Sequence, residues 1–251
     1  MLSVQNVTKS FGGFTALAGC SIDVNAGTIT GIIGPNGAGK STLFNIVGGV
    51  QAPTGGDILL EGRGIATLTP QQRARAGLVR TFQISRELGQ LTVLENMLLA
   101  SADTIGDAIW SNFIFPRSVR RAQETAIARA RILLEQVDLW RMADEPARNL
   151  SGGQKKLLEI SRALMLQPKI VLLDEPCAGV SPAMGRIVAN TISRLRARGI
   201  TFAIIEHDMD IIATLCDPIY VLAEGRTLTS GSFAEVTSNH DVMRAYLGRV
   251  A

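Results

Sequence analysis

The stretch GPNGAGKST, residues 34–42, fits the pattern GxxxxGK[ST]. An apolar, strand-like run over 28–33 precedes it, and a helical pattern over 41–47 follows. In such a loop the glycines let backbone N–H groups converge on phosphate oxygens, Lys40 neutralises phosphate charge, and the Ser41 hydroxyl is a Mg²⁺ ligand. The flanking strand and helix disfavour a chance match. The candidate phosphate-binding residues are Gly34, Pro35, Asn36, Gly37, Ala38, Gly39, Lys40, Ser41 and Thr42.

Other apolar, β-branched runs recur along the chain, each bounded by turn-forming or charged residues. They cover residues 170–173, 201–205 and 219–222. Continuous apolar runs of this length are typical of parallel strands that are buried on both faces. Helical patterns lie between them, so the sequence predicts an α/β fold with a doubly wound sheet.

The middle of the chain, from about Ser85 to Pro168, contains no convincing strand. Five apolar residues there recur with the spacing of an amphipathic helix: Ala126, Ala130, Leu133, Leu134 and Val137. We therefore expect one domain, residues 1–251, with a core of about 1–84 and 168–251 and an inserted helical subdomain of about 85–167. The aromatic segment 109–115 (IWSNFIF) either contacts a membrane partner or packs the subdomain against itself, and the ordinary burial of aromatics favours packing.

Composition excludes several classes of function. The formal charge of the 251 residues is +3 and no run of Lys or Arg exceeds two, which does not support a nucleic-acid footprint. Three separated cysteines without a CxxC motif favour reduced thiols in the cytosol, and the presence of two histidines argues against a His-rich metal site. The sequence has neither a signal peptide nor an apolar run long enough to span a membrane, so membrane work would need another chain.

Two acidic residues, Asp174 and Glu175, follow the apolar run 170–173. A phosphate loop also needs a carboxylate at the end of a second strand, and Asp174 is placed to reach Mg²⁺ there through water. Glu175 is then the candidate general base that polarises the attacking water. The alternative, a surface carboxylate, is weakened because adjacent acids at the end of an apolar strand are costly without a cation or a reaction.

A second glycine-containing motif, LSGGQ at 150–154, precedes the helical pattern 155–166. Ser151 is a candidate N-cap, and the exposed backbone N–H groups of Gly152 and Gly153, followed by Gln154, form a second anion site. One nucleotide does not need two such sites from one chain. The sequence therefore predicts that this motif binds the γ-phosphate held by another copy, with a plain helix start as the alternative.

Two further polar residues follow predicted strands. Gln83, after the run 78–82, is a candidate ligand of the metal or of its water, and His207, after 201–205, is a candidate donor to the γ-phosphate. A single histidine is as often structural as active, so the residues alone leave the role of His207 open.

Together these motifs resemble the ATP-binding cassette family over the whole chain. The matching elements are the Walker A loop Gly34–Ser41, the Q-loop residue Gln83, the signature Leu150–Gln154, the Walker B strand Ile170–Asp174 with Glu175 beside it, the D-loop Ala178–Ser181 and the switch histidine His207. The D-loop departs from the family pattern, with Val180-Ser181-Pro182 where a Leu-Asp-Pro type is commoner.

The resemblance implies a RecA-like core with an antiparallel β subdomain, and two cassettes that close head to tail on two ATP molecules with Mg²⁺. It implies that Lys40 of one chain and Ser151 of the other hold each ATP, and that His207 takes the active role. Phe11, where a tyrosine is usual, would stack on adenine. It also implies a peripheral protein at the cytoplasmic face of the inner membrane, with transmembrane permease subunits, a second cassette subunit and, indirectly, a periplasmic solute-binding protein.

Within the family the chain is most similar to ATPases of branched-chain amino acid importers. The similarity lies in VRTFQ (79–83), RRAQ (120–123), IEHDM (205–209) and RAYLG (244–248). Alternatives are a cassette that powers lipopolysaccharide or other export, a soluble non-transport cassette protein, and a module that binds ATP without cleaving it. The last is disfavoured by the presence of Lys40, Glu175 and His207 together.

Overall fold

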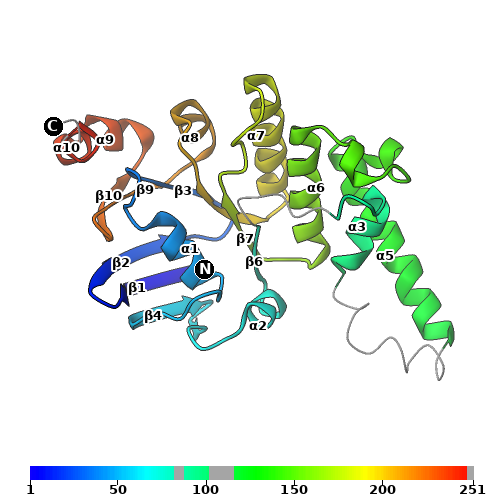
Figure 1. Ribbon diagram of the computed structural model, residues 1–251, viewed down its shortest axis with the longest axis horizontal. Coiled ribbons are helices and arrows are strands. Elements are labelled where there is room, and N and C mark those ends of the chain that lie inside the picture. The colour runs from blue at the N-terminus through cyan, green and yellow to red at the C-terminus, as the bar shows by residue number, and fades with distance from the viewer. Residues whose placement is uncertain (82–87, 102–115, 248–251) are drawn as a thin grey trace.

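The computed structural model describes residues 1–81, 88–101 and 116–247. A mainly parallel sheet runs through the centre of the molecule (Figure 1). In the described residues its strand order is β10-β9-β3-β8-β7-β6, and only β10 is antiparallel to its neighbour. The strands are β3 (Ile29–Ile33), β6 (Leu78–Arg80), β7 (Ile170–Asp174), β8 (Thr201–Ile205), β9 (Ile219–Ala223) and β10 (Arg226–Gly231).

The predicted buried strands are confirmed within one or two residues. Every residue of β3, β7 and β8 is buried, as expected for strands covered on both faces. The strand predicted over 78–82 ends at Arg80, and Phe82 lies outside the described residues.

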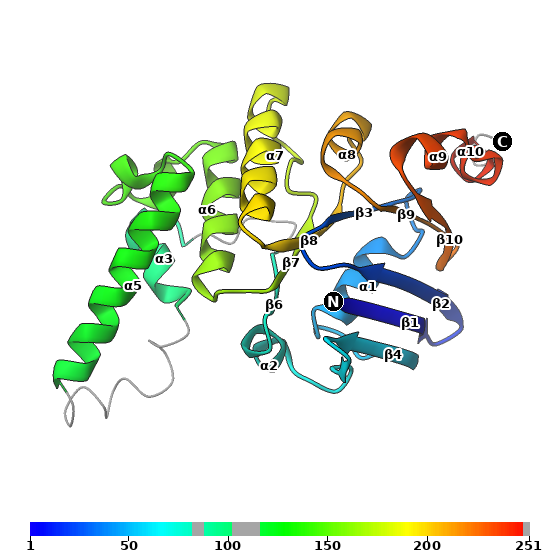
Figure 2. The same cartoon turned by 180° about the vertical axis from the view of Figure 1, so that it is seen from behind.

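A second, antiparallel sheet lies beside the first and has the order β2-β1-β4-β5. Its strands are β1 (Leu2–Phe11), β2 (Phe14–Val24), β4 (Gly55–Leu60) and β5 (Arg63–Gly64). Helix α1 (Lys40–Val47) lies between the two sheets in both ribbon views (Figures 1 and 2). Leu43 and Ile46 of α1 share one buried cluster with residues of β1 and β7, so the helix after the phosphate loop is clamped on two sides.

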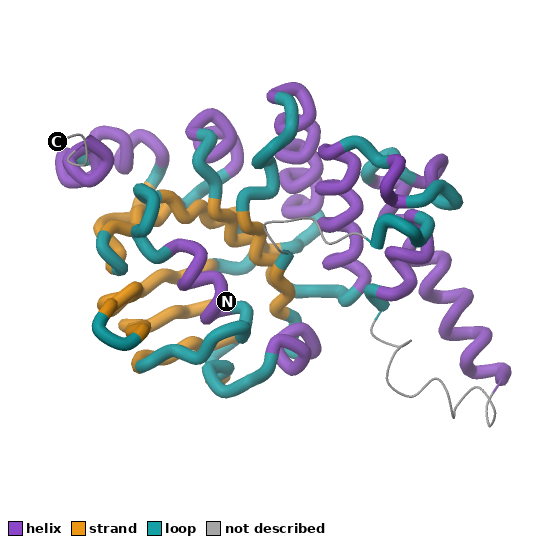
Figure 3. The backbone as a smooth tube through the Cα atoms, viewed as in Figure 1, coloured by secondary structure: helices purple, strands orange, loops and turns teal. Residues whose placement is uncertain are grey.

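Helices cover the other face of the parallel sheet, as the tube view shows (Figure 3). They are α7 (Pro182–Ala197), α8 (Met209–Leu215), α9 (Phe233–Ser238) and α10 (His240–Leu247). Val188 and Ile192 of α7 share a buried cluster with Val171 and Leu173 of β7. The parallel sheet is thus covered on both faces, as the doubly wound prediction requires.

Between β6 and β7 the described residues form helices and no strand. These are α3 (Val93–Leu99), α5 (Pro116–Gln136), α6 (Gly152–Met165) and the short 3₁₀ helices η1 (Trp140–Met142) and η2 (Ala147–Asn149). The predicted amphipathic face of α5 is confirmed, because Ala130, Leu133 and Leu134 are buried in the cluster that includes α3 and α6. Ala126 packs against this cluster partly buried, and Val137, which is also buried in it, directly follows the helix. The aromatic segment 109–115 lies outside the described residues.

Helix α2 (Pro70–Arg75) lies outside this helical region, next to β6 and the antiparallel sheet. Among the residues that the structure describes, no helix has both the length and the apolar character needed to cross a lipid bilayer.

Candidate nucleotide-binding site

The phosphate loop connects the end of β3 to the start of α1. Gly34 has φ +150°, and a Cβ atom there would lie 2.1 Å from the carbonyl oxygen of Leu222 on β9. Gly39, with φ +99°, is the N-cap of α1 and provides no side-chain hydrogen bond to the first turn. The backbone N–H groups at this helix start therefore remain available to an anion, which the helix dipole also favours.

Lys40 bends back over the loop that precedes it. Its Nζ donates hydrogen bonds to the carbonyl oxygens of Gly34 at 2.6 Å and Pro35 at 3.1 Å. Burial lowers the pKa of Lys40, while the charges of Glu175 and Asp174 oppose that shift. A cation held among acceptors in this way can exchange the two carbonyl oxygens for phosphate oxygens.

A cavity of about 240 Å³ lies over this loop. The cavity brings together three segments that the sequence predicted to meet: the loop residues 36–42, Glu175 and His207. Gly34 and Pro35 do not line the cavity, but their carbonyl oxygens accept the hydrogen bonds from Lys40 Nζ.

The aromatic residue at the cavity is Phe14, at the start of β2, rather than Phe11. The two rings belong to residues that pair across the tip of the β1–β2 hairpin, and both side chains are exposed. The sequence analysis did not identify Phe14. The available signal was its position three residues after Phe11 across a Gly-Gly turn, which places both aromatics at one hairpin tip.

Asp174 ends β7 and is 2% exposed. Its Oδ2 accepts a hydrogen bond from Nη2 of Arg80 at 2.9 Å, and Nη1 of Arg80 donates to Oδ1 of Asn45 at 2.6 Å. Arg80 therefore joins the end of β6, the end of β7 and helix α1. The sequence analysis missed this arginine, because nothing in the local pattern of 78–82 distinguishes a buried ion pair from a solvated charge.

The second oxygen of Asp174 bears on the predicted metal site. Oδ1 is buried, and no described residue donates a hydrogen bond to it. Such an oxygen fits a metal-bound water, and Ser41 in the first turn of α1 supplies the hydroxyl of the phosphate loop. Within the described ranges no three His, Cys, Asp or Glu side chains cluster as a metal site. Gln83, the third predicted ligand, lies outside the described residues.

Glu175 and His207 meet at the mouth of the cavity. His207 Nε2 lies 2.5 Å from Glu175 Oε1, a contact in which the imidazole N–H donates to the carboxylate. Glu175 has φ +52°, the left-handed region that a residue with a side chain rarely adopts. The two residues come from the loops after β7 and β8, which are neighbouring strands of the sheet.

The signature segment 150–154 forms a capping box at the start of α6. The Ser151 hydroxyl accepts from the Gln154 N–H at 3.4 Å, and Gln154 Oε1 accepts from the Ser151 N–H at 2.8 Å, which confirms Ser151 as the N-cap. The helix begins at Gly152, three residues before the predicted start, because the capping box draws both glycines into its first turn. A Cβ at Gly153 would lie 1.8 Å from Met184 Cγ, so α6 approaches α7 closely at this point. None of residues 151–154 lines the cavity over Lys40.

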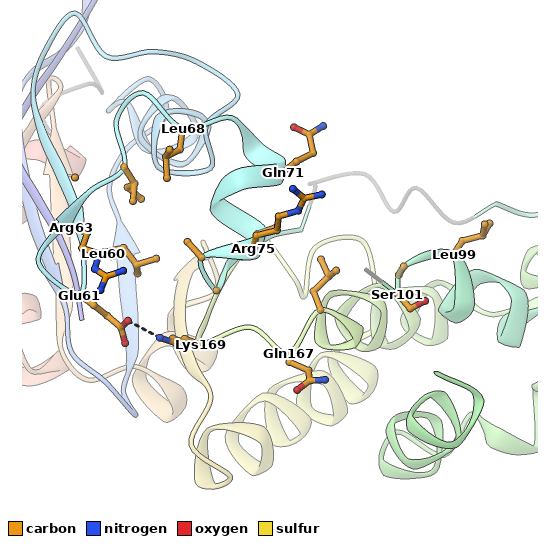
Figure 4. A pocket seen from close by; sticks show the side chains of 17 residues that line it. Leu60, Glu61, Arg63, Leu68, Gln71, Arg75, Leu99, Ser101, Gln167 and Lys169 are labelled. Carbon is orange, nitrogen blue, oxygen red and sulfur yellow. Dashed lines mark hydrogen bonds and ion pairs between the residues drawn. The ribbon is translucent and has the colours of Figure 1, made fainter. Parts of the chain in front are cut away.

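A larger cleft, about 1020 Å³, lies at the opposite edge of the sheet (Figure 4). Its walls come from the β4–β5 turn, α2 and the ends of α3 and α6, and Lys169 Nζ pairs with Glu61 Oε2 at 2.6 Å inside it. Gly77 and Lys169, which line it, directly precede β6 and β7. The cleft is therefore at the amino ends of these strands and contains none of the predicted nucleotide-binding residues.

Comparison with known proteins agrees with this geometry. The family profile described as ABC transporter matches residues 17–178. The chain is 40% identical to the high-affinity branched-chain amino acid transport ATP-binding protein LivG of Escherichia coli K12, over 99% of this chain and 98% of the relative. It is 39% identical to the probable branched-chain amino acid transport ATP-binding protein LivG of Methanocaldococcus jannaschii, over 99% and 97% of the two chains.

Solved structures give the same result. The ADP conformation of an ATP-binding cassette of an ABC transporter superposes with a TM-score of 0.86 at 39% identity, covering 99% of this chain and 98% of the other. A dimeric post-hydrolysis cassette bound to ADP and Pi matches with a TM-score of 0.74 at 25% identity, covering 93% and 99%.

Proposed function

Because the chain belongs to the ABC transporter family of ATP-binding cassettes, we propose that it hydrolyses ATP to drive the import of branched-chain or other hydrophobic amino acids. The observation that carries the ATPase activity is the single cavity that joins the phosphate loop, Glu175 and His207. The solute class follows from the names of relatives that match nearly the whole chain. As part of this proposal, residues of about 85–167 form a helical subdomain inserted into the core.

Each residue of the cavity has a role in the proposed reaction. Lys40 exchanges the carbonyl oxygens of Gly34 and Pro35 for the β- and γ-phosphate oxygens. Glu175 orients and deprotonates the attacking water as general base. His207 exchanges Glu175 for the γ-phosphate and donates its N–H to the charge that develops there.

Ser41, Gln83 and Asp174 are the residues that would hold Mg²⁺, Asp174 through water. When bound, the ion neutralises phosphate charge and fixes the triphosphate for in-line attack. Phe11 and Phe14, at the hairpin tip, offer ring faces for stacking on adenine.

The signature segment of a second cassette completes the site. In this chain Gly152 and Gly153 present backbone N–H groups at the start of α6, while those of Ser151 and Gln154 bond within the capping box. None of these four residues lines the cavity over Lys40. A head-to-tail pair, homodimeric or heterodimeric, places Ser151, Gly152, Gly153 and Gln154 of one chain against the γ-phosphate held by Lys40 of the other. A related cassette is dimeric with ADP and Pi bound.

We place the pair at the cytoplasmic face of the inner membrane, attached to transmembrane permease subunits that receive solute from a periplasmic binding protein. The competing function is the cassette of a lipopolysaccharide or other export system. Uptake of labelled leucine by a strain that carries this chain with its membrane partners separates the two, because an export cassette supports no uptake.

The catalytic proposal is tested with Glu175→Gln. Loss of the general base should lower turnover by at least about 100-fold, while nucleotide binding is kept. Undiminished turnover would remove Glu175 from its assigned role. The matched control is Glu235→Gln on α9, where the glutamine can still accept the Ser232 N–H of its capping box.

The shared-site proposal is tested in the Glu175→Gln background by sedimentation with and without MgATP. ATP should shift the protein towards dimer, and Ser151→Asp should abolish the shift. Aspartate keeps the N-cap of α6 but places negative charge where the second anion site meets phosphate. A dimer that forms equally well with Ser151→Asp would contradict the shared site.

A further inference from the structure

Glu206 is a charged residue that is 3% exposed, in the link between β8 and α8. Its two carboxylate oxygens accept from two different segments. Oε1 accepts the backbone N–H of Cys177 at 2.7 Å, and Oε2 accepts the backbone N–H of His207 at 3.2 Å. Burial raises the pKa of Glu206, and these hydrogen bonds oppose that shift.

The first of these bonds holds the turn that carries Glu175. Glu175 is left-handed, with φ +52°, and such a conformation persists only where the surrounding structure holds it. The backbone N–H of Glu175 donates to the carbonyl oxygen of Ile205 at 2.9 Å, and the carbonyl oxygen of Glu175 accepts from the backbone N–H of Ala178 at 3.1 Å. The bond from Cys177 to Glu206 fixes the middle of this turn and therefore the direction of the Glu175 side chain.

The second bond holds the backbone of His207. The imidazole of that residue donates to Glu175 at 2.5 Å, so both members of this pair are attached to the same buried carboxylate through their backbones. The thiol of Cys177 donates to the carbonyl oxygen of Gly185 at 3.7 Å, and burial together with the charge of Glu206 raises the pKa of this thiol to about 12.

We propose that Glu206 is a positioning residue for ATP hydrolysis, which holds Glu175 and His207 in register by accepting one backbone N–H from each of their loops. The inference rests on the proposed roles of Glu175 and His207. It requires a carboxylate, because the N–H groups of Cys177 and His207 bond different oxygens of Glu206. Glutamine of the same length offers one acceptor and points its NH₂ group at the other N–H.

The kinetic test compares Glu206→Gln with wild type and with the control Glu235→Gln. We expect kcat per bound nucleotide to fall about 10- to 100-fold, the effect of misplacing reacting groups by about an ångström. The KM for ATP should stay within about twofold, because Glu206 does not line the Lys40 cavity. Wild-type kcat in Glu206→Gln would overturn the proposal.

A spectroscopic test reads the geometry directly and without turnover. The chain has two histidines, His207 and His240, so in a His240→Gln background one imidazole gives the side-chain ¹⁵N signal. We expect Glu206→Gln to shift the Nε2 resonance of His207 towards the value in Glu175→Gln, where the carboxylate partner is absent. An unchanged resonance overturns the proposal.

Glu206→Asp is the second variant, for use if glutamine prevents folding. Aspartate keeps the charge but is one methylene shorter and reaches only one of the two N–H groups, so the same kinetic and spectroscopic changes are expected. The outcomes also separate the two proposals. Equal hydrolysis by wild type and Glu175→Gln removes the role of Glu175, whereas an unmoved His207 signal removes only that of Glu206.

Discussion

Arg73 on α2 offers a sharp test of how the phosphate-loop helix is held in place. It is 1% exposed and donates hydrogen bonds to four backbone carbonyl oxygens. Two of these belong to the last residues of α1: Nη1 lies 2.5 Å from Ile46 and 2.7 Å from Val47. The others are Ala66 at 2.9 Å and Leu68 at 3.0 Å. The guanidinium thus caps the carboxyl end of the helix whose amino end carries Lys40.

Arg73→Met keeps most of the volume and removes all four bonds. The Ile46 oxygen also accepts from the Gly49 N–H at 3.1 Å and keeps that partner, but the Val47 oxygen loses its charged donor in a buried setting. An unsatisfied buried acceptor costs about 1–3 kcal/mol, and each hydrogen bond to a charged group contributes about 1.5–3 kcal/mol. Burial of the guanidinium costs desolvation energy, which also lowers the pKa of Arg73, and Arg73→Met removes this cost. We therefore expect the free energy of unfolding to fall by about 3 kcal/mol in total.

The assay is equilibrium unfolding in urea at pH 7.5, followed by far-ultraviolet circular dichroism. The control is Arg75→Met, an exposed residue of the same helix, which should change the unfolding free energy by less than about 0.5 kcal/mol. If Arg73→Met loses less than about 1 kcal/mol, Arg73 does not stabilise the end of α1 in the way the geometry implies.

Two further outcomes follow from burial and backbone geometry. Burial raises the pKa of Cys216 from 9.0 to about 12, so the native thiol keeps its proton where the unfolded chain has lost it, and stability falls as pH rises from 9 towards 12. Between pH 8 and 10 the unfolding free energy of wild type should fall by about 1.4 kcal/mol more than that of Cys216→Ala, and equal slopes would contradict this. Gly34→Ala should abolish ATP binding, because its Cβ would lie 2.1 Å from the Leu222 oxygen, whereas Gly64→Ala, with nothing within 4 Å and no left-handed φ, should bind ATP normally.

The sequence was sufficient to predict the parallel sheet and the elements at its carboxyl edge. Strands such as β3, β7 and β8 are buried on both faces, so their residues form continuous apolar runs that can be recognised in the sequence. The phosphate loop was recognisable because its backbone must follow one path around a phosphate, and this path fixes the spacing of its glycines and lysine. Glu175 and His207 were each predicted to act next to the γ-phosphate, and their positions after the neighbouring parallel strands β7 and β8 bring the two side chains into contact.

Helix boundaries were less accurate where capping decides them. The start of α6 was predicted too late because two glycines argue against a helix by propensity. Ser151 and Gln154 satisfy the first N–H groups reciprocally, which offsets that penalty. Phe14 was missed for a different reason: two aromatics at one hairpin tip are equivalent until the strand register places one of them over the loop.

Two buried charged residues, Arg73 and Glu206, and the partly buried Arg80 were not predicted at all. Charged side chains are mostly exposed, so from the sequence alone each of these residues is predicted to be a solvated surface group. Their burial depends on partners 26 to 94 positions away: Val47 for Arg73, Cys177 for Glu206 and Asp174 for Arg80. The spacing of apolar residues along a helix or strand does not predict contacts between residues so far apart in the sequence.

These three residues share one property that bears on how the site works. Arg73 bonds the end of the helix that starts at Lys40, Arg80 bonds the carboxylate of Asp174, and Glu206 bonds the loops of Glu175 and His207. A buried charge is stable only while its partners stay in place, because leaving it unpaired is costly. Each charge therefore restrains an element that carries a residue of the proposed site. The motifs predict which groups react, and these three charged residues, which belong to none of the motifs, bond the backbone or side chains that position the predicted groups.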